Sequence, residues 1–328
     1  MQLNYVTDAP ELVRQFLVYN EAIKNKSSST VEEYYRDLIT FFKYIKHIKG
    51  KIPSDAEFDK IDISDVDIEL IRSITTYDLH SFLVYCKTER DNNSTTRARK
   101  VSTLRQFFKY LTSHAHLLEI NPAEMLDAPK LKKTLPKHLT LEDSVELLNS
   151  VKESDSPNAI RDYCIITLFL NCGLRLSELC GLNVTDITSD GSLRVLGKGN
   201  KERVIYLNEA CTSSLLEYLK IRPNEGVPAD HKNALFISRN KRRISNKTVQ
   251  HIVYTYLEKA GLGGQGLSTH KLRHTAATLM YQHGGVDVRV LQNVLGHENL
   301  GTTQIYTHVA DAQVKNAIDS NPLSKIKK

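Results

Sequence analysis

Four side chains able to bind, activate and attack a phosphodiester fall within residues 268–308 of this 328-residue chain. His270 and Arg273 are three residues apart in STHKLRHTAATL, a stretch without Gly or Pro that predicts a helix, so both side chains share one helical face. His297 follows the glycine that ends a second predicted helix, and Tyr306 comes nine residues later. Taken singly, such residues are usually solvated or packed. The ordered combination rarely arises by chance, which favours a functional site.

Two further basic residues could complete that site. Arg175, in GLRLSEL, is closely surrounded by leucines, so it requires either a carboxylate partner, with Glu178 three residues away, or a bound anion. Lys198 lies between glycines at the tip of a β-hairpin predicted over residues 192–207. Most hairpin-tip lysines serve only solubility, but the basic residues before and after this one favour contact with a ligand.

Cleavage of a phosphodiester requires neutralised oxygen charge, a nucleophile, and a proton for the leaving oxygen. Arg175, Arg273 and His297 are the natural oxygen ligands, because guanidinium groups match the geometry of phosphate. Tyrosine as the nucleophile would give a covalent phosphotyrosyl intermediate. No carboxylate cluster suited to Mg²⁺ accompanies these residues, so we expect neither a metal nor another cofactor.

The length of the chain predicts two domains, each mainly helical. Apolar periodicity and capping residues predict a first bundle of four helices over 10–25, 29–46, 75–90 and 94–114. Residues 55–69 carry seven carboxylates against one lysine, and we expect them to form a loop or a short helix away from DNA. A segment over 120–140 with three prolines and no sustained period is typical of a linker.

The second domain is predicted to contain the hairpin and further helices over 140–151, 163–172, 207–222, 245–261, 270–279 and 287–295.

Basic residues suggest where DNA binds. The helix over 94–114 alternates an apolar face with a basic face that includes Arg97, Lys100 and Arg105. In the second domain the candidates are Lys201 and Arg203 beside the hairpin turn, and Arg242 and Arg243 in the basic stretch 239–243. A solvated surface is the alternative for each.

The composition limits the classes of protein to which the chain could belong. The chain is 41% hydrophobic and 25% charged, as in ordinary globular proteins, and its net charge of +6 favours a polyanionic partner. Five cysteines without a C-x-x-C pair argue against a disulfide framework and a zinc site. No apolar run is long enough to span a membrane, and residues 1–13 do not read as a signal peptide. We expect a cytoplasmic, nucleoid-associated protein.

With these motifs the chain resembles the tyrosine recombinase (phage integrase-like) family, most closely its Xer-like bacterial branch. The resemblance implies a helical, SAM-like core-binding domain over 1–118, a linker over 119–138 and a mixed α/β catalytic domain over 139–328, together forming a C-shaped clamp on DNA. It identifies six catalytic positions, all of which are filled: Arg175, Lys198, His270, Arg273, His297 and the nucleophile Tyr306.

The family's chemistry implies that Tyr306 attacks to leave a 3′-phosphotyrosine, with Lys198 as general acid for the 5′-hydroxyl and His270 assisting proton transfer. It also implies a tetramer on paired recombination sites, either a homotetramer or a heterotetramer with a related recombinase, that exchanges strands through a Holliday junction without ATP or metal. A regulatory partner protein is compatible with this scheme, and the sequence identifies none.

Four functions remain open from the sequence. The absence of a separate arm-binding domain favours resolution of chromosome or plasmid dimers over integration of a mobile element, while the acidic insertion over 50–70 departs from the simplest Xer pattern. A type IB topoisomerase would share much of the chemistry but act as a monomer. A non-enzymatic architectural DNA-binding protein is the fourth possibility, and the complete catalytic set argues against it.

Overall fold

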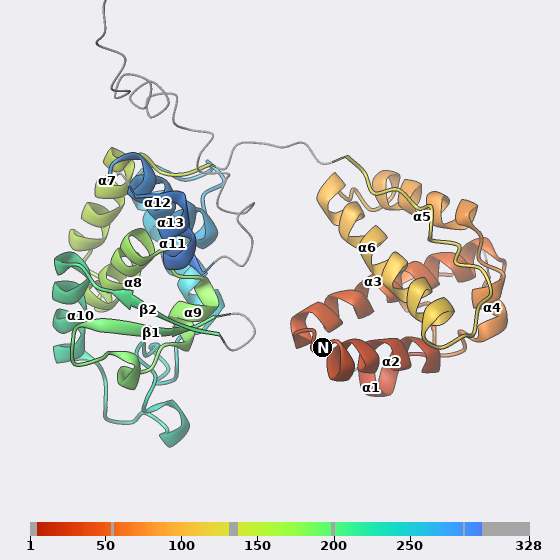
Figure 1. Cartoon of the computed structure of the whole chain (residues 1–328), viewed down its shortest axis with the longest axis horizontal. Helices are drawn as coiled ribbons and strands as arrows, with labels where there is room; N and C mark the ends of the chain where they lie inside the picture. Colours follow the sequence, from red (N-terminus) through yellow and green to blue (C-terminus); the bar gives the residue numbers. More distant parts are fainter. Residues whose placement is uncertain (1–4, 54–55, 131–136, 198–200, 285, 297–328) are drawn as a thin grey trace, which may run out of the picture. The chain divides into compact units, whose positions relative to one another are not determined.

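The computed structural model describes residues 5–53, 56–130, 137–197, 201–284 and 286–296. The chain forms two compact units, Met1–Lys133 and Thr134–Lys328. Both are mainly helical, and the described strands form a single two-stranded antiparallel sheet in the second unit (Figure 1). The expected fold class, mainly helical with a small sheet, is confirmed. None of the described helices has the length and apolar character needed to cross a bilayer.

The first unit is a helical bundle around an aromatic core. Phe16 and Phe107 meet edge to face, with ring centroids 5.4 Å apart, and Phe41 meets Phe82 in the same manner at 5.2 Å. The four predicted helices are all present, although the first becomes a π-helical turn after Val18. The helical elements of this unit are α1 Tyr5–Asp8, α2 Glu11–Val18, the π-helix Tyr19–Ile23, α3 Ser28–Ile48, the 3₁₀ turn Phe58–Lys60, α4 Ile68–Arg72, α5 Thr76–Thr88 and α6 Ser94–Ser113.

The acidic insertion packs onto α3 through both apolar and charged contacts. Ile61, Ile63 and Val66 are buried. The Lys46 ammonium donates to the Asp65 carboxylate at 2.7 Å and to the Asp62 carbonyl oxygen at 2.7 Å. Lys46 therefore offsets part of the insertion's negative charge, and the insertion's isoleucines anchor it to the bundle.

Part of the segment expected to be a linker also belongs to the first unit. Ala123 and Leu126 are fully buried in the aromatic core, and the Thr76 hydroxyl donates to the Pro122 carbonyl oxygen at 2.9 Å. Residues as far as Leu126 therefore pack with the bundle. Leu139, near the other end of the expected linker, is buried in the core of the second unit.

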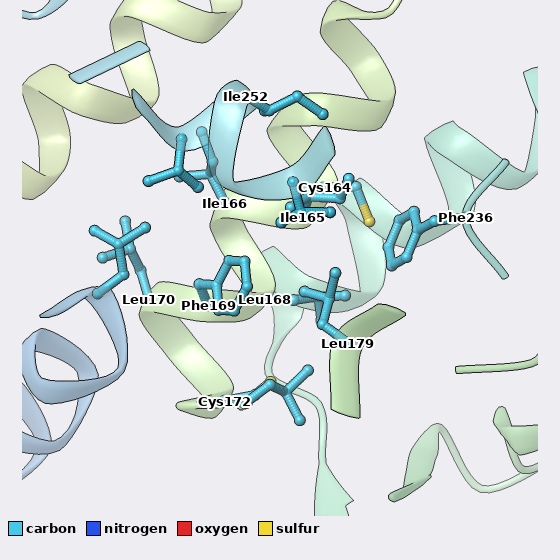
Figure 2. Close-up of a cluster of buried hydrophobic side chains, with 14 of the residues drawn as sticks. Cys164, Ile165, Ile166, Leu168, Phe169, Leu170, Cys172, Leu179, Phe236 and Ile252 are labelled. Atoms are coloured by element: carbon cyan, nitrogen blue, oxygen red, sulfur yellow. The ribbon is translucent and has the colours of Figure 1, made fainter. Parts of the chain in front are cut away.

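The second unit is built around α8, whose side chains are buried along almost its whole length. Ile165, Leu168 and Phe169 are fully buried, and Figure 2 shows them among the side chains of the surrounding elements. Helices α7, α10 and α12 pack against α8. The helical elements of this unit are α7 Leu141–Lys152, α8 Ala159–Cys172, α9 Leu176–Gly181, the 3₁₀ turns Val184–Asp186 and Ala229–His231, α10 Glu209–Ile221, α11 Asn246–Lys259, α12 Thr269–Gln282 and α13 Val288–Leu295.

The predicted hairpin consists of β1 (Ser192–Leu196) and β2 (Glu202–Tyr206), which pair antiparallel with Val195 opposite Arg203. The Gly197 amide donates to the Lys201 carbonyl oxygen at 2.7 Å, which draws the two strands together at the turn. One face of the hairpin, including Leu193 and Val195, is buried against the core. Lys198 at its tip lies outside the described residues.

Candidate active site and DNA-binding residues

Arg175 lies at the N-cap of α9, two residues after the left-handed glycine, Gly173, that ends α8 with φ 58°. Its guanidinium donates through Nη1 to Glu178 Oε1 at 2.6 Å, and its amide donates to Glu178 Oε2 at 2.7 Å. A further bond runs from Nη2 to the Gly296 carbonyl oxygen at 2.9 Å. Of the two partners considered for this arginine, the structure supplies the carboxylate. The side chain is still 32% exposed, so an anion could also reach it.

Glu178 is the centre of a group that we call the arginine cluster: Arg175, Arg203 and Arg273 around one carboxylate. Arg203 binds Glu178 in a bidentate manner, at 2.8 Å from Nη1 and 2.9 Å from Nη2, and Arg273 Nη1 lies 3.7 Å from Oε2. Only 2% of the Glu178 side chain is exposed. Burial alone would raise the pKa of Glu178, but hydrogen bonds from Arg203 and Arg175 outweigh it and lower the pKa to about 2. Three guanidiniums against one carboxylate leave excess positive charge, which favours binding of an anion.

Arg273 is held by the backbone at the ends of two other helices. It extends from α12, and its Nη1 donates to the Gly173 carbonyl oxygen at 2.7 Å while Nη2 donates to that of Leu295 at 2.6 Å. Its side chain is 3% exposed. These bonds satisfy carbonyls that the last turns of α8 and α13 leave unpaired. Arg273 therefore joins α12 to the C-terminal ends of α8 and α13.

His270 lies one turn before Arg273 on α12, as predicted, and is exposed. Its Nε2 is 3.1 Å from Nε2 of His274. Desolvation first, and then the positive charges of Arg273, Lys271 and Arg175, lower the pKa of His270 below its usual value of 6.5. The lowered pKa favours the neutral ring, the form that can accept a proton from a hydroxyl group.

The structure brings together three of the six predicted catalytic residues: Arg175, His270 and Arg273. The other three, Lys198, His297 and Tyr306, lie outside the described residues. In the sequence, His297 directly follows Gly296, the last described residue, whose carbonyl oxygen accepts the bond from Arg175. The predicted helix before it is confirmed, with Asp287 as N-cap and Gly296 as a left-handed C-cap.

Arg203 and Arg243, both expected at the DNA surface, are bound within the protein. Arg203 holds Glu178 and donates through Nε to the Val294 carbonyl oxygen at 3.1 Å, which joins β2 to α13. Arg243 Nη1 donates to the carbonyl oxygens of Gly181 and Leu182, each at 2.8 Å, and so caps the end of α9. Their guanidinium groups therefore bind protein acceptors that hold the elements around the site together. Lys201 and Arg242, by contrast, are exposed.

The sequence predicted Glu178 only as one of two possible partners of Arg175, not as the centre of three arginines, and it did not predict the internal role of Arg203. The sequence signal for Glu178 is its spacing: it follows Arg175 by three residues, so its carboxylate lies one helical turn away and can accept at the helix N-terminus. No comparable local signal marks Arg203, because its partners are 25 and 91 residues away in the chain.

On α6 the predicted basic face is only partly correct. Lys100 was expected to face DNA, but it is 8% exposed, and its ammonium donates to the buried Asp37 carboxylate of α3 at 2.9 Å. Thr103 also donates to Asp37, at 2.8 Å. Lys100 is therefore a core residue, because a buried carboxylate requires a charged partner. Arg105 is 44% exposed, and Arg97 is half-buried.

Lys100→Ala is expected to lower the free energy of unfolding by about 3 kcal/mol, because it removes one partner of a buried ion pair. Lys109→Ala, on the exposed side of the same helix, is the control and should change stability by less than about 0.5 kcal/mol. Urea denaturation of both variants measures the difference. Equal stabilities would show that the Lys100 pair contributes nothing.

Comparison with known proteins identifies the class to which this fold and site belong. Residues 137–313 match the Phage integrase family, and residues 61–115 match the Phage integrase, N-terminal SAM-like domain. The chain therefore belongs to the tyrosine recombinase (phage integrase) family, whose members cleave and rejoin DNA.

Within the family the chain is similar to Xer recombinases. It is 52% identical over 316 residues to Tyrosine recombinase XerC of Caldanaerobacter subterraneus subsp. tengcongensis, covering 96% of this chain and 88% of that protein. It is 41% identical over 244 residues to Tyrosine recombinase XerD of Proteus mirabilis, covering 74% of this chain and 77% of that protein. The chain is thus an Xer-like site-specific recombinase, as the sequence motifs predicted.

A solved structure supports the same fold. The XerH site-specific recombinase bound to difH substrate superposes with a TM-score of 0.68 at 23% identity, covering 94% of this chain and 84% of that chain. At this level of identity the likeness concerns the fold.

Proposed function

We propose that the arginine cluster binds the scissile phosphate of a recombination site and that Tyr306 attacks its phosphorus. The observation that carries this proposal is the convergence of three guanidiniums on buried Glu178, next to the backbone that leads to His297. Arg175, the most exposed of the three, binds a non-bridging oxygen. Arg273 adds its charge at short range and fixes the helix ends.

The chemical step then exchanges one phosphodiester for another. The Tyr306 oxygen forms a bond to phosphorus while the bond to the 5′-oxygen breaks, which leaves a 3′-phosphotyrosine. Lys198 gives a proton to the departing 5′-oxygen, and neutral His270 accepts the tyrosine proton directly or through water. Attack by a 5′-hydroxyl on the phosphotyrosine reverses the step. No bond energy is lost, so the scheme needs neither ATP nor metal.

The test of this proposal is covalent trapping on a nicked suicide substrate, in which the 5′-fragment diffuses away after cleavage. We expect a protein–DNA adduct joined through Tyr306, located by mass spectrometry of the protease-digested complex. Saturated binding without any adduct would contradict the proposal and favour an architectural DNA-binding role.

Lys198→Ala should slow cleavage of normal DNA by roughly 10²- to 10⁴-fold, the usual contribution of a general acid. A substrate with a 5′-bridging sulfur should restore cleavage by the variant, because a thiolate leaves without a proton. Both rates are measured in single-turnover cleavage assays, and Lys220→Ala, at an exposed position of α10, is the control. If the sulfur substrate fails to rescue the variant, Lys198 has another role, such as organising the hairpin.

For biological role, we propose resolution of chromosome or plasmid dimers at cell division, with the protein on the nucleoid. Similarity to proteins named XerC and XerD supports this role over integration of a mobile element.

We propose that four protomers act on paired sites and resolve a Holliday junction, in a homotetramer or with a second recombinase. Sequencing of DNA covalently captured in the host would identify the site, and a junction formed by the purified chain alone would favour the homotetramer. DNA relaxation without junctions would instead indicate a topoisomerase.

For the DNA surface, we propose that Arg97, Arg105, Lys201 and Arg242 contact phosphates. Arg105 and Arg242 are exposed on the two units, and Lys201 follows the hairpin turn. Each phosphate contact contributes to the salt dependence of binding.

A further inference from the structure

Two buried cysteine thiols lie next to the residues that hold the arginine cluster. Sγ of Cys172 and Sγ of Cys211 are 3.7 Å apart, although the residues are 39 positions apart in the chain. Cys172 is the last residue of α8, and Figure 2 places it at that end of the helix, below Cys164. Both thiols are free in the structure. The cleavage scheme uses neither.

The surrounding structure holds the two thiols at this separation. Cys211 lies in the first turn of α10, where its amide donates to the side chain of the N-cap residue Asn208 at 3.0 Å. The Asn208 side chain also donates to Asn171, the neighbour of Cys172, at 2.9 Å. The start of α10 is thus fixed to the end of α8 beside the thiol pair. A sulfur–sulfur bond of about 2.05 Å would then require closure of less than about 2 Å.

The two thiols also differ in acidity. A hydrogen bond from Cys172 lowers the pKa of Cys211, opposed by burial, and the backbone hydrogen bond with Asn208 adds to the lowering. The same hydrogen bond, together with burial, raises the pKa of Cys172. Cys211 is therefore the thiol that reacts first, and Cys172 is placed to resolve it.

We propose that Cys172 and Cys211 form a reversible disulfide, made by hydrogen peroxide, that slows DNA cleavage. The Cys211 thiolate attacks a peroxide oxygen to give a sulfenic acid and hydroxide, which is protonated to water. Cys172 then attacks the Cys211 sulfur, the disulfide forms, and a second water leaves. Two electrons pass from the sulfurs to the peroxide, and a dithiol reductant returns them.

The link to activity runs through Gly173. It follows Cys172 directly, and its carbonyl oxygen binds Arg273 at 2.7 Å. The end of α8 has little space to adjust, because a Cβ at Gly173 would lie 2.8 Å from Leu295 Cδ2. Closure of the disulfide would therefore shift the carbonyl that positions Arg273. This part of the proposal rests on the proposed function of the arginine cluster, while formation of the bond does not.

The experiment treats the reduced full-length protein with hydrogen peroxide over minutes to hours, because both thiols are buried and react only as the first turn of α10 opens. The protein is alkylated in denaturant, digested with trypsin and analysed by mass spectrometry. We expect residues 162–175 linked to residues 204–220, with fragment ions that assign the bond to Cys172 and not to Cys164. Cleavage of the suicide substrate should fall by roughly 10- to 100-fold and recover with dithiothreitol.

Cys211→Ala should neither form the link nor lose cleavage after peroxide treatment, whereas Cys86→Ala, a buried cysteine of the first unit, should behave as wild type. If Cys211→Ala fails to fold, Cys172→Ala and the reversible loss of activity in the wild type provide the same test. A bond from Cys164, no bond in folded protein, or a complete bond with undiminished cleavage would overturn the proposal. Reduced wild-type protein that never cleaves would instead contradict the proposed function, and the mass measurement would still decide whether the bond forms.

Discussion

Tyr306→Phe is expected to lower DNA cleavage by at least roughly 10⁴-fold, the scale of loss when a covalent nucleophile is removed. The variant keeps the ring and loses only the hydroxyl oxygen that would bond to phosphorus. Its affinity for the recombination site should stay within about twofold, because a single hydroxyl contributes little to a DNA interface dominated by phosphate contacts. Single-turnover cleavage and a gel-shift titration measure the two quantities.

The matched control is Tyr254→Phe, which makes the same chemical change at a tyrosine that is 59% exposed on α11. It should cleave at the wild-type rate. If Tyr306→Phe still carries out strand transfer, Tyr306 is not the nucleophile, and another residue must attack the phosphorus.

The second large effect is expected from Glu178→Gln, which retains the size of the side chain but leaves three guanidiniums without a carboxylate. Unfolding free energy at pH 7 should fall by roughly 3 kcal/mol, since the pKa of Glu178 is lowered from 4.5 to about 2 and each unit corresponds to about 1.4 kcal/mol. Cleavage should fall by at least about 10²-fold, because Arg175 and Arg273 lose the group that aligns them.

The pH dependence of this effect has a definite sign. A carboxylate with a lowered pKa in the folded state stabilises the protein fully above the unfolded value of 4.5, and this stabilisation is lost as the pH falls from there towards 2. The stability difference between wild type and Glu178→Gln should therefore be constant between pH 6 and pH 8 and shrink below about pH 4.5. Urea denaturation at pH 7 and pH 3.5 tests this, with Glu146→Gln as the exposed control. A difference that does not change with pH would exclude the charge of Glu178 as its cause.

Local patterns predicted most of the elements that build the site. The helix ends at Gly173 and Gly296, the hairpin, and the shared face of His270 and Arg273 all follow from spacing within a few turns of chain. Within α13, periodicity indicates an apolar face but not which edge of that face meets a neighbour: Leu291 and Leu295 are fully buried, whereas Val294 is only half-buried.

The roles of individual basic residues were harder to predict, for a physical reason. Whether a lysine or arginine faces DNA or a buried acceptor depends on groups that are distant in sequence. Lys100 is bound to Asp37, 63 residues earlier, and Arg243 to carbonyls about 60 residues earlier. The sequence shows the charge of these residues, but their partners become visible only when the helices have packed. The pair formed by Cys172 and Cys211 is another such case, because nothing in the cysteine spacing indicated it.

The acceptors that hold Arg175 and Arg273 include main-chain carbonyls at Gly173, Leu295 and Gly296. A substitution changes a side chain but does not delete a carbonyl. A selection for variants that recombine a different DNA site could therefore randomise exposed positions of α13, such as Val290 and Asn293, while Arg175 and Arg273 keep their acceptors. Gly173 and Gly296 are the exceptions, because both adopt a positive φ, 58° and 62°, and a Cβ at either position would crowd a neighbouring side chain. In such a library, the exposed positions of α13 should tolerate wide sampling of sequence, and diversity should disappear at Gly173, Gly296 and Glu178.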